Sequence, residues 1–357
     1  MQKSQSSPDL STLPVGYKLN GYTIKSILGQ GGFGITYLAH DNNLERDVAI
    51  KEFMPQDMAT RSADYTVHSL GETEDSVCQL EWGLERFIRE ARTLSKFNHP
   101  NIVRVHTVFE TNSTAYMVMS YEKGISFSER LKMGQPSEEE LTDMVLGLLD
   151  GLESMYAEGF IHRDIKPGNI FIRADGTALI LDFGSARQAM GEEAMTLTKV
   201  ASPGYAPFEQ YYGRSDMQGP WTDIYALGAT LYRAITGEAP TDATFRNRTS
   251  GEEAIQEIVD ILDKHNDKYS PFLLRAVEHA IRTNHKDRPQ TVDEWRTMLS
   301  DPNLSTVTQW RYAESSFKKK SANKREEKKK IHWKDYLVYA SLIIALVALT
   351  YTYLQNS

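Results

Sequence analysis

Short apolar runs separated by turn residues fill the chain from Tyr22 to about Met119, and this pattern predicts β-strands. The runs are YTIKSIL, ITYLAH, DVAIKEF, IVRVHTVFE and AYMVMSY. A single helix interrupts them, because the apolar residues of LERFIREARTLSKF recur at the spacing of one helical face, and HPN at 99–101 ends it. The first part of the chain is therefore expected to form a small strand-rich lobe.

Helical patterns dominate from about residue 126. EEELTDMVLGLLDGLESMYAEG predicts a long amphipathic helix closed by Gly159, and further helices are predicted for ALGATLYRAITG, FLLRAVEHAIR and TVDEWRTMLS. The predicted fold class is α+β, with a small β-rich lobe followed by a larger α-helical lobe. A cleft is expected between the lobes, because ligands favour such interfaces.

The C-terminal stretch YLVYASLIIALVALTYTYL, residues 336–354, carries no charge. As a helix it would span roughly 28 Å, close to the ~30 Å hydrocarbon core of a bilayer. Tyrosines lie near both ends, Trp333 precedes it, and the basic run FKKKSANKREEKKKIHWK lies upstream, which is typical of a span whose N-terminal side is cytoplasmic. We expect a transmembrane helix at 336–354, a basic juxtamembrane linker at 301–335 that contacts membrane lipid, and a short tail at 355–357. A buried or self-associating helix is the alternative.

Composition narrows the classes of function. Hydrophobic residues make up 40% and charged residues 25% of the 357 residues, as in ordinary globular proteins, and the net charge of −8 provides no global footprint for nucleic acid. Cys78 is the only cysteine, so the chain forms no intramolecular disulfide, which fits a reducing compartment. Residues 1–16 are polar, lack the apolar stretch of a signal peptide, and are expected to form a flexible N-terminus.

The stretch GQGGFGITYL, residues 29–38, concentrates glycines beside strand-forming residues. Glycines at this spacing are weak evidence alone, since a dinucleotide site requires a helix directly after them and an acid about twenty residues further on. Two strand patterns follow instead, which favours a hairpin loop whose backbone N–H groups approach phosphate oxygens. An ordinary glycine-rich turn is the other interpretation.

Three further motifs decide between these interpretations. VAIK at 48–51, IHRDIKPGN at 161–169 and LDFG at 181–184 follow the glycines in the order of the protein-kinase signature set. On these motifs the chain resembles the Hanks-type, or eukaryotic-like, Ser/Thr protein kinases, and among them it is most similar to membrane-anchored bacterial kinases. The resemblance covers residues 17–300 and implies a bilobal protein-kinase fold.

The resemblance implies an N-lobe at about 17–119 and a C-lobe at about 123–300. It implies transfer of the γ-phosphate of ATP to Ser or Thr hydroxyls of protein substrates, with Mg²⁺ (or Mn²⁺ in its place) as the metal. It also implies activation-loop autophosphorylation and a bacterial inner membrane as the location, while the basic flank of the predicted span places the kinase domain on the cytoplasmic side. Self-association of the chain, which would favour phosphorylation in trans, is a further hypothesis. The alternative function is that of a membrane-tethered pseudokinase, a scaffold that binds nucleotide without transfer.

Phosphoryl transfer needs a carboxylate near the attacking hydroxyl and cations that neutralise the developing charge. By resemblance, Asp164 orients the substrate hydroxyl and Lys166 stabilises the transferred phosphate, an arrangement that marks Ser/Thr rather than tyrosine kinases. Asn169 and Asp182 are the expected magnesium ligands, because amide and carboxylate oxygens suit this hard cation. The retention of these residues argues against the pseudokinase alternative.

Lys51 is the expected strand lysine that holds the α- and β-phosphates, and Glu90 is its expected partner from the helix. Glu85 is the weaker helical alternative. Glu52 is excluded from this role, because neighbouring residues on a strand point to opposite faces.

The residues expected to contact ATP come from the glycine loop, the central strands, the hinge and the floor of the cleft. They are Gly29, Gln30, Gly31, Gly32, Phe33, Gly34, Thr36, Ala49, Lys51, Met119, Ser120, Tyr121, Glu122 and Phe171. In the resemblance Ala49 and Phe171 sandwich adenine, and Met119 is the gatekeeper that precedes the hinge at 120–122. Thr36 is a departure, since the family has valine at this position.

Arg163 implies a pocket for a phosphate on the activation loop, which is expected to run from Asp182 to Glu209. Thr196 and Thr198 are the candidate phosphosites, because a phosphate there would pair with Arg163 and order the loop. Ser202 is expected to contact the catalytic loop and to serve the substrate platform.

Further expectations concern structural residues. The Ala-Pro-Glu motif of the family is interrupted by Phe208, so that only Glu209 is retained, and Arg288 is its expected buried partner. Asp223 is expected to anchor the catalytic-loop backbone from a helix. The internal hydrophobic spine implied by the resemblance consists of Leu94, Val105, His162 and Phe183.

The stretch from Pro55 to Glu81 is longer than a minimal connection between the strand of Lys51 and the helix of Glu90. It contains a candidate hairpin, ATRSADYTVHSL. This insertion either regulates the helix or is decoration, and the tolerance of loops to insertion favours decoration.

Overall fold

The structure is a computed structural model that describes residues 11–32, 34–181, 202–211, 217–247 and 251–300. The chain divides into two units, Met1–Ser300 and Asp301–Ser357. The second unit, which contains the expected juxtamembrane linker and the expected 336–354 helix, lies outside the described residues. Within the described ranges, no helix combines the length and the apolar character that crossing a membrane requires.

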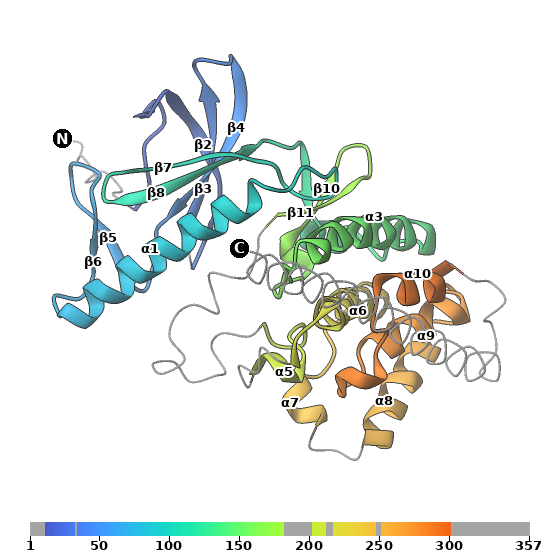
Figure 1. The fold of residues 1–357 in the computed structure, drawn as a ribbon. Coiled ribbons are helices and arrows are strands. Elements are labelled where there is room, and N and C mark those ends of the chain that lie inside the picture. The colour runs from blue at the N-terminus through green and yellow to red at the C-terminus, as the bar shows by residue number, and fades with distance from the viewer. Residues whose placement is uncertain (1–10, 33, 182–201, 212–216, 248–250, 301–357) are drawn as a thin grey trace, which may run out of the picture. The chain divides into compact units, whose positions relative to one another are not determined.

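An antiparallel sheet of six strands forms the N-terminal part of the first unit (Figure 1). Its strands follow the order β1 (Lys18–Leu19), β2 (Tyr22–Gly31), β3 (Gly34–Asp41), β4 (Arg46–Phe53), β8 (Thr114–Ser120) and β7 (Val105–Thr111). The apolar runs of the sequence predict all of these strands except the short β1. Burial alternates along β3, whereas β8, which lies between two other strands, is buried along almost its whole length.

Helix α1 (Glu74–Leu94) packs against β7 and β8. Thr73 caps its first turn by accepting a hydrogen bond from the Ser76 N–H, and two acidic residues follow the cap. The helix begins well before Leu84, where the predicted pattern starts. Its first turns lack an apolar stripe, since Val77 there is 41% exposed, so hydrophobic periodicity detects only the second half of the helix.

The hydrophobic core of this lobe lies on one face of the sheet. Its members are Leu13, Leu19, Ile24, Ile35, Tyr37, Ala39, Val48, Ile50, Met54, Ala59, Val67, Tyr116 and Val118. Leu13 is 2% exposed, and its N–H donates to the Tyr37 hydroxyl over 3.1 Å. The expectation of a flexible segment through residue 16 therefore differs from the structure at Leu13, because this residue is held by apolar packing and a buried hydrogen bond.

The insertion after β4 folds as an antiparallel hairpin of β5 (Ala59–Arg61) and β6 (Val67–Ser69). It stands beside the N-terminal end of α1 in Figure 1, and β6 contacts this helix. Ala59 and Val67 belong to the core cluster. The insertion is therefore an integral part of the lobe, in contrast to the expectation that favoured decoration.

Helices form most of the remaining described residues of the first unit. They are α2 (Phe127–Lys132), α3 (Glu138–Ala157), α5 (Phe208–Tyr211), α6 (Pro220–Thr236), α7 (Ala243–Arg246), α8 (Gly251–Asp263), α9 (Pro271–Ala280) and α10 (Val292–Ser300), with short turns η1 (Pro167–Asn169) and η4 (His285–Asp287). A small sheet has the order β11 (Ala178–Ile180), β10 (Ile170–Arg173) and β9 (Gly124–Ser126).

The sequence patterns predict α3, α6, α9 and α10, but not α8 or the shorter helices. Helix α3 is followed by Gly159 with φ +79°, a left-handed conformation that glycine adopts without strain. Helix α6 is buried along almost its whole length and forms the centre of this part of the unit. The predicted α+β organisation, with a strand-rich lobe followed by a helical one, is confirmed.

We expect Leu13→Ala to lower the free energy of unfolding by about 2–5 kcal/mol, because it leaves a cavity against the sheet. Val15→Ala is the control, since Val15 is 74% exposed and its truncation should change stability by less than about 0.5 kcal/mol. Urea unfolding of the purified chain measures both variants. Equal effects of the two substitutions would show that the N-terminal segment around Leu13 does not pack on the sheet.

Candidate active site

Several residues that are expected to bind ATP lie on one face of the six-stranded sheet. Thr36 lies opposite Lys51 in the register of β3 and β4, and Ala49 lies opposite Met119 in that of β4 and β8. Opposed residues of antiparallel strands share a face, as do alternate residues along a strand. All four residues therefore share one face. Glu52 points to the other face, as the alternation predicts, and is 0% exposed there.

The glycine stretch connects β2 to β3 as a hairpin turn, as the strand pattern predicts. A Cβ atom at Gly29, Gly31 or Gly32 would meet no atom within 4 Å, so the backbone is open to a ligand at these positions. A Cβ atom at Gly34 would instead lie 2.0 Å from the Glu52 carbonyl oxygen. Gly34 is therefore required by the pairing of β3 with β4, and not only by the approach of phosphate.

Lys51 and Glu90 stand on two elements that pack together. The Phe53 ring of β4 lies 5.7 Å from the Phe87 ring of α1, measured between ring centroids. Phe53 follows Lys51 by two residues and so shares its face, while Phe87 lies one turn before Glu90. Glu90 is 6% exposed, whereas Glu85 is exposed to solvent. This difference in burial favours Glu90 over Glu85 as the acidic partner from the helix.

The hinge begins at the end of β8, directly after the buried Met119. Glu122 accepts hydrogen bonds from Nε and Nη2 of Arg173 over 3.0 and 3.2 Å. Because Arg173 lies in β10, this ion pair ties the hinge to the strand that also carries the half-buried Phe171. The Glu122 carboxylate is thus engaged with the protein, which leaves the backbone of 120–122 as the expected contact with adenine.

The Asp164 carboxylate is the centre of the catalytic loop. Lys166 Nζ lies 3.1 and 3.0 Å from its two oxygens, and Ser202 Oγ donates to Oδ1 over 2.9 Å. Asn169 Nδ2 donates to Asp164 Oδ2 over 2.9 Å and to its carbonyl oxygen over 2.8 Å. Because the amide nitrogen of Asn169 faces Asp164, its Oδ1 is the atom suited to bind a hard metal ion.

A buried carboxylate holds the backbone of this loop. Asp223, in α6, accepts the N–H of His162 over 2.8 Å and the N–H of Arg163 over 2.7 Å, as the resemblance implies. Burial raises the pKa of Asp223, and these donors act in the opposite direction. Arg163 has φ +71°, an unfavourable conformation for a residue other than glycine, and the two hydrogen bonds stabilise it.

Two residues of this support were not found from the sequence. The Tyr156 hydroxyl donates to Asp223 Oδ2 over 3.0 Å, and Gln210 Nε2 donates to the Arg163 carbonyl oxygen over 2.7 Å. Burial, together with Asp223, raises the pKa of Tyr156 well above its usual value, so this hydroxyl stays protonated and remains a donor. Neither residue belongs to a motif. The only sequence feature that could have identified one of them is the position of Gln210 directly after Glu209.

The expected pair of Glu209 and Arg288 is present and buried. Arg288 Nη1 and Nη2 donate to the two carboxylate oxygens of Glu209 over 2.7 and 3.1 Å, and both side chains are at most 2% exposed. The guanidinium also lies 4.7 Å from the centre of the Tyr225 ring. Removal of either partner would leave a buried charge, so this pair fixes the segment that follows the activation loop.

Several predicted residues lie outside the described ranges. They are Phe33, Asp182, Phe183, Thr196 and Thr198. The other three members of the expected spine are buried: Leu94 is 1% exposed, Val105 is 5% exposed and His162 is 0% exposed. Within the described ranges, no group of three or more His, Cys, Asp or Glu residues is arranged to hold a metal. The chemistry of Asn169 fits a metal ligand, and the role of Asp182 stays a prediction.

A basic hollow of about 220 Å³ lies between α1 and the catalytic loop. Arg86 and Arg89 of α1 line it together with Arg163, and Glu90 is the one acidic residue of the lining. Burial lowers the pKa of Arg163, and the attraction of Asp223 partly opposes this effect. The sequence pointed to Arg163 but not to the two arginines of the helix, because only the packing of α1 brings them near the loop.

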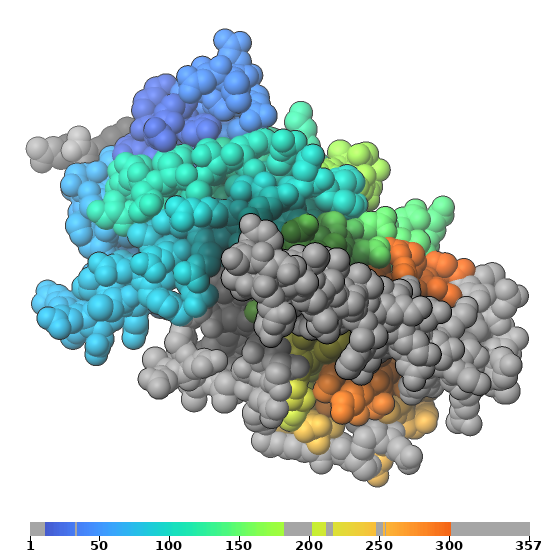
Figure 2. Space-filling view, viewed as in Figure 1, coloured from blue at the N-terminus to red at the C-terminus, as the bar shows by residue number. Residues whose placement is uncertain are grey.

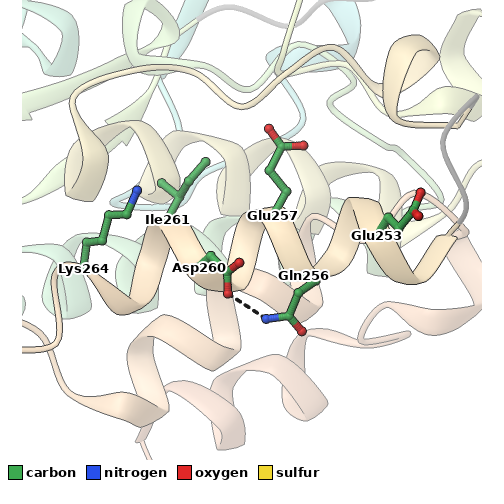
Figure 3. Close-up of a pocket in the computed structure, with 6 residues that line it drawn as sticks. All are labelled: Glu253, Gln256, Glu257, Asp260, Ile261 and Lys264. Carbon is green, nitrogen blue, oxygen red and sulfur yellow. Dashed lines mark hydrogen bonds between the residues drawn. The ribbon is translucent and has the colours of Figure 1, made fainter.

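A second, shallow hollow lies on α8 and differs in character (Figure 3). Its lining consists of Glu253, Gln256, Glu257, Asp260, Ile261 and Lys264, and Gln256 Nε2 donates to Asp260 Oδ1 over 2.7 Å. All of these residues come from one helical face or its end, and three are acidic. Lys264 is the one cation in this lining and faces three carboxylates, so the surface is unsuited to a nucleotide phosphate.

A glycine turn over a strand lysine and an aspartate–lysine–asparagine catalytic loop below it define an enzyme of phosphoryl transfer. Comparison with known families agrees with this class. Residues 22–300 match the family described as "Protein kinase domain", and the chain belongs to this family. The predicted bilobal kinase fold is thereby confirmed.

Relatives and solved structures support this assignment. The chain is 32% identical to "Serine/threonine-protein kinase C" of Synechocystis sp. over 75% of its length and 47% of the relative's. It is 30% identical to "Serine/threonine-protein kinase PknA" of Nostoc sp., over 81% of this chain and 48% of that one. The chain thus spans about half the length of the curated relatives it matches. The structure titled "PpkA-294 apo form" covers 81% of this chain and 100% of its own, with 38% identity and a TM-score of 0.73.

We expect Gly34→Ala and Gly31→Ala to have opposite effects. Gly34→Ala should destabilise the lobe by about 1–3 kcal/mol, because the new methyl group collides with the backbone of β4. Gly31→Ala meets no neighbour, so it should leave stability within about 0.5 kcal/mol. Its effect should instead be a KM for ATP raised several-fold, because the methyl group occupies the space over the phosphates. Thermal unfolding and steady-state kinetics measure the two quantities, and a reversed pattern would contradict these roles.

Proposed function

We propose that this chain is a protein kinase that transfers the γ-phosphate of ATP to Ser or Thr hydroxyls of proteins, with Mg²⁺ as the metal. The observation that carries the proposal is the cluster in which Lys166, Ser202 and Asn169 all contact the Asp164 carboxylate. The names of the relatives, which are serine/threonine-protein kinases, support the choice of acceptor. A pseudokinase scaffold is not favoured, because this cluster is complete.

The cluster suggests how the residues share the work. Asp164 would accept a hydrogen bond from the acceptor hydroxyl and aim its oxygen, since Ser202 and Asn169 hold the carboxylate in place. Lys166 would stabilise the negative charge on the transferred phosphate, and its contact with Asp164 keeps the ammonium group in the site. Lys51 and the open backbone at 29–32 would bind the phosphates of ATP. Bound magnesium would supply further neutralisation of phosphate charge, with Asn169 and Asp182 as its ligands.

Activation-loop phosphorylation belongs to the same proposal. Arg86, Arg89 and Arg163 line one hollow, and guanidinium groups bind phosphate through paired hydrogen bonds. A phosphate on Thr196 or Thr198 is the proposed occupant. It would link α1, which carries Glu90, to the catalytic loop and so favour the active arrangement.

Asp164→Asn should lower phosphate incorporation into protein by about 10²–10⁴-fold, because an amide cannot accept the hydroxyl proton. Asp143→Asn is the control, since Asp143 is an exposed aspartate of α3. Mass spectrometry of each purified chain after incubation with ATP and Mg²⁺ measures the extent and the sites of phosphorylation. We expect phosphate on Thr196 or Thr198 in the control alone. Equal incorporation by both variants would overturn the kinase proposal.

Membrane anchoring is a separate part of the proposal. The uncharged run at 336–354 and the basic run before it support a single-pass C-terminal anchor, with the kinase domain in the cytoplasm and the basic linker at the lipid surface. Self-association through the membrane segment would raise the local concentration and favour phosphorylation in trans. Trans-phosphorylation rates that do not depend on enzyme density in vesicles would reject this last point.

We expect the full chain to stay in bacterial membranes through washes at high salt, whereas a fragment of residues 1–330 should be released. High salt screens the contact of the basic linker with lipid but leaves an apolar span in place. Immunoblots of the washed pellet and the supernatant measure the partition. Retention of the fragment after the wash would show that 336–354 is not the anchor.

A further inference from the structure

The carboxylate of Glu52 lies in the core of the strand-rich lobe and receives three hydrogen bonds. Tyr37 donates to its Oε2 over 2.8 Å, and Tyr116 donates to its Oε1 over 2.6 Å. Arg61 Nη2 lies 2.7 Å from Oε2, and the side chains of Glu52 and Arg61 are both 0% exposed. Arg61 belongs to the inserted hairpin, so the insertion places a charged side chain in the core of the lobe, against one face of the sheet.

The tyrosines extend this cluster to other segments. The Tyr37 hydroxyl accepts the N–H of Leu13, and the Tyr116 hydroxyl accepts a hydrogen bond from Asn112 Nδ2 over 3.0 Å. Burial raises the pKa of both tyrosines, with Glu52 adding to the effect, so that both remain donors to the carboxylate. The Val67 N–H of the hairpin donates in turn to the Asn112 carbonyl oxygen over 2.8 Å. One buried carboxylate thereby connects the N-terminal segment, three strands and the hairpin.

The hairpin also reaches two elements of the ATP site. Three residues before β5, the Gln56 N–H donates to the Gly32 carbonyl oxygen in the glycine turn over 3.1 Å. At its end, a connection of only four residues, 70–73, joins β6 to α1, the helix that carries Glu90. Figure 2 shows the hairpin and the first turns of α1, both light blue, together at one end of the visible surface of the lobe. The position of the hairpin therefore constrains both the glycine turn and the beginning of α1.

We infer that Glu52 and Arg61 are positioning residues for nucleotide binding. Their ion pair sets the hairpin in one place relative to β4, and the hairpin in turn places α1 and Glu90 relative to Lys51, the residue directly before Glu52. Apolar packing of Ala59 and Val67 holds the hairpin to the lobe, but the ion pair selects its position. This inference rests on the proposed kinase function and adds to it a determinant on the face of the sheet opposite to ATP.

The test compares two double variants of the full chain. Glu52→Gln/Arg61→Met removes both buried charges together, which avoids the unpaired charge that either single substitution would leave, so folding should be retained. Lys25→Met/Asp47→Asn is the matched control, because it removes an ion pair with the same strand β4 on an exposed surface, where the side chains are 46% and 36% exposed. Melting temperature shows whether each variant folds. A variant within about 5 °C of the parent chain has kept its core.

Two readouts separate positioning from mere stability. Amide hydrogen exchange of α1 should be faster by about tenfold in the Glu52/Arg61 variant, and affinity for a fluorescent ADP analogue should be weaker by about tenfold, with both unchanged in the control variant. Unchanged exchange in α1, or unchanged affinity in a folded variant, would overturn the inference. If the variant does not fold, Arg61→Lys decides instead. This substitution keeps the charge but shortens the reach, and normal affinity alongside faster exchange in α1 would equally reject the inference.

The route through Glu90 has its own test. In a Glu90→Gln background, the Glu52/Arg61 substitutions should produce no further loss of nucleotide affinity, because the residue they position is already lost. An equal loss in both backgrounds would overturn the route. Nucleotide binding requires no phosphoryl transfer, so a chain that binds but does not phosphorylate would refute the proposed function and leave the inference standing. If the parent chain binds no nucleotide, the proposed function and the inference both fail.

Discussion

Successive side chains of a β-strand point to opposite faces, and this structure depends on how β4 uses that constraint. Lys51 points to the face that carries the glycine turn and α1, while Glu52 points into the core. A shift of one residue in the register of β4 would exchange them and bury the lysine among apolar side chains. Pairing with β3 and β8 on its two sides prevents such a shift. Gly34 permits this pairing, because a side chain there would collide with the Glu52 carbonyl group.

A comparable device fixes the catalytic loop. Asp223 belongs to α6, and its carboxylate is buried away from water. Hydrogen bonds from two consecutive backbone N–H groups compensate the loss of its hydration. Arg163, which carries the second of these N–H groups, has a left-handed backbone conformation, and hydrogen bonds to its N–H and to its carbonyl group hold this strained residue from both sides. Gln210 holds the Arg163 carbonyl group, and it directly follows Glu209, which Arg288 fixes in turn. The placement of Asp164 thus depends on buried polar contacts outside the cleft.

The elements that could be predicted from the sequence are those marked by a pattern or motif of neighbouring residues along the chain. Apolar runs indicated the strands, and the motifs at 29–38, 48–51 and 161–169 indicated which loops meet around the site. Arg61 and Gln210 gave no such signal, because a polar residue outside a motif looks the same in sequence whether it is buried or solvated. Leu13 was missed for the corresponding reason, since one leucine in a polar terminus shows no periodicity. Their roles follow from tertiary pairing alone.

The buried pair of Glu52 and Arg61 needs a physical reason, because apolar side chains of similar volume often stabilise a protein as well or better. Specificity of position supplies one. The two strands of the hairpin are each 3 residues long and form a sheet of their own, so the strand ladder of the six-stranded sheet does not fix where the hairpin packs. A displacement by the length of one residue along a strand is about 3.3 Å. The short connection to α1 would pass this movement to Glu90, whereas the contact between a guanidinium and a carboxylate tolerates no such displacement. An ion pair of little net stability is then retained for the arrangement that it selects.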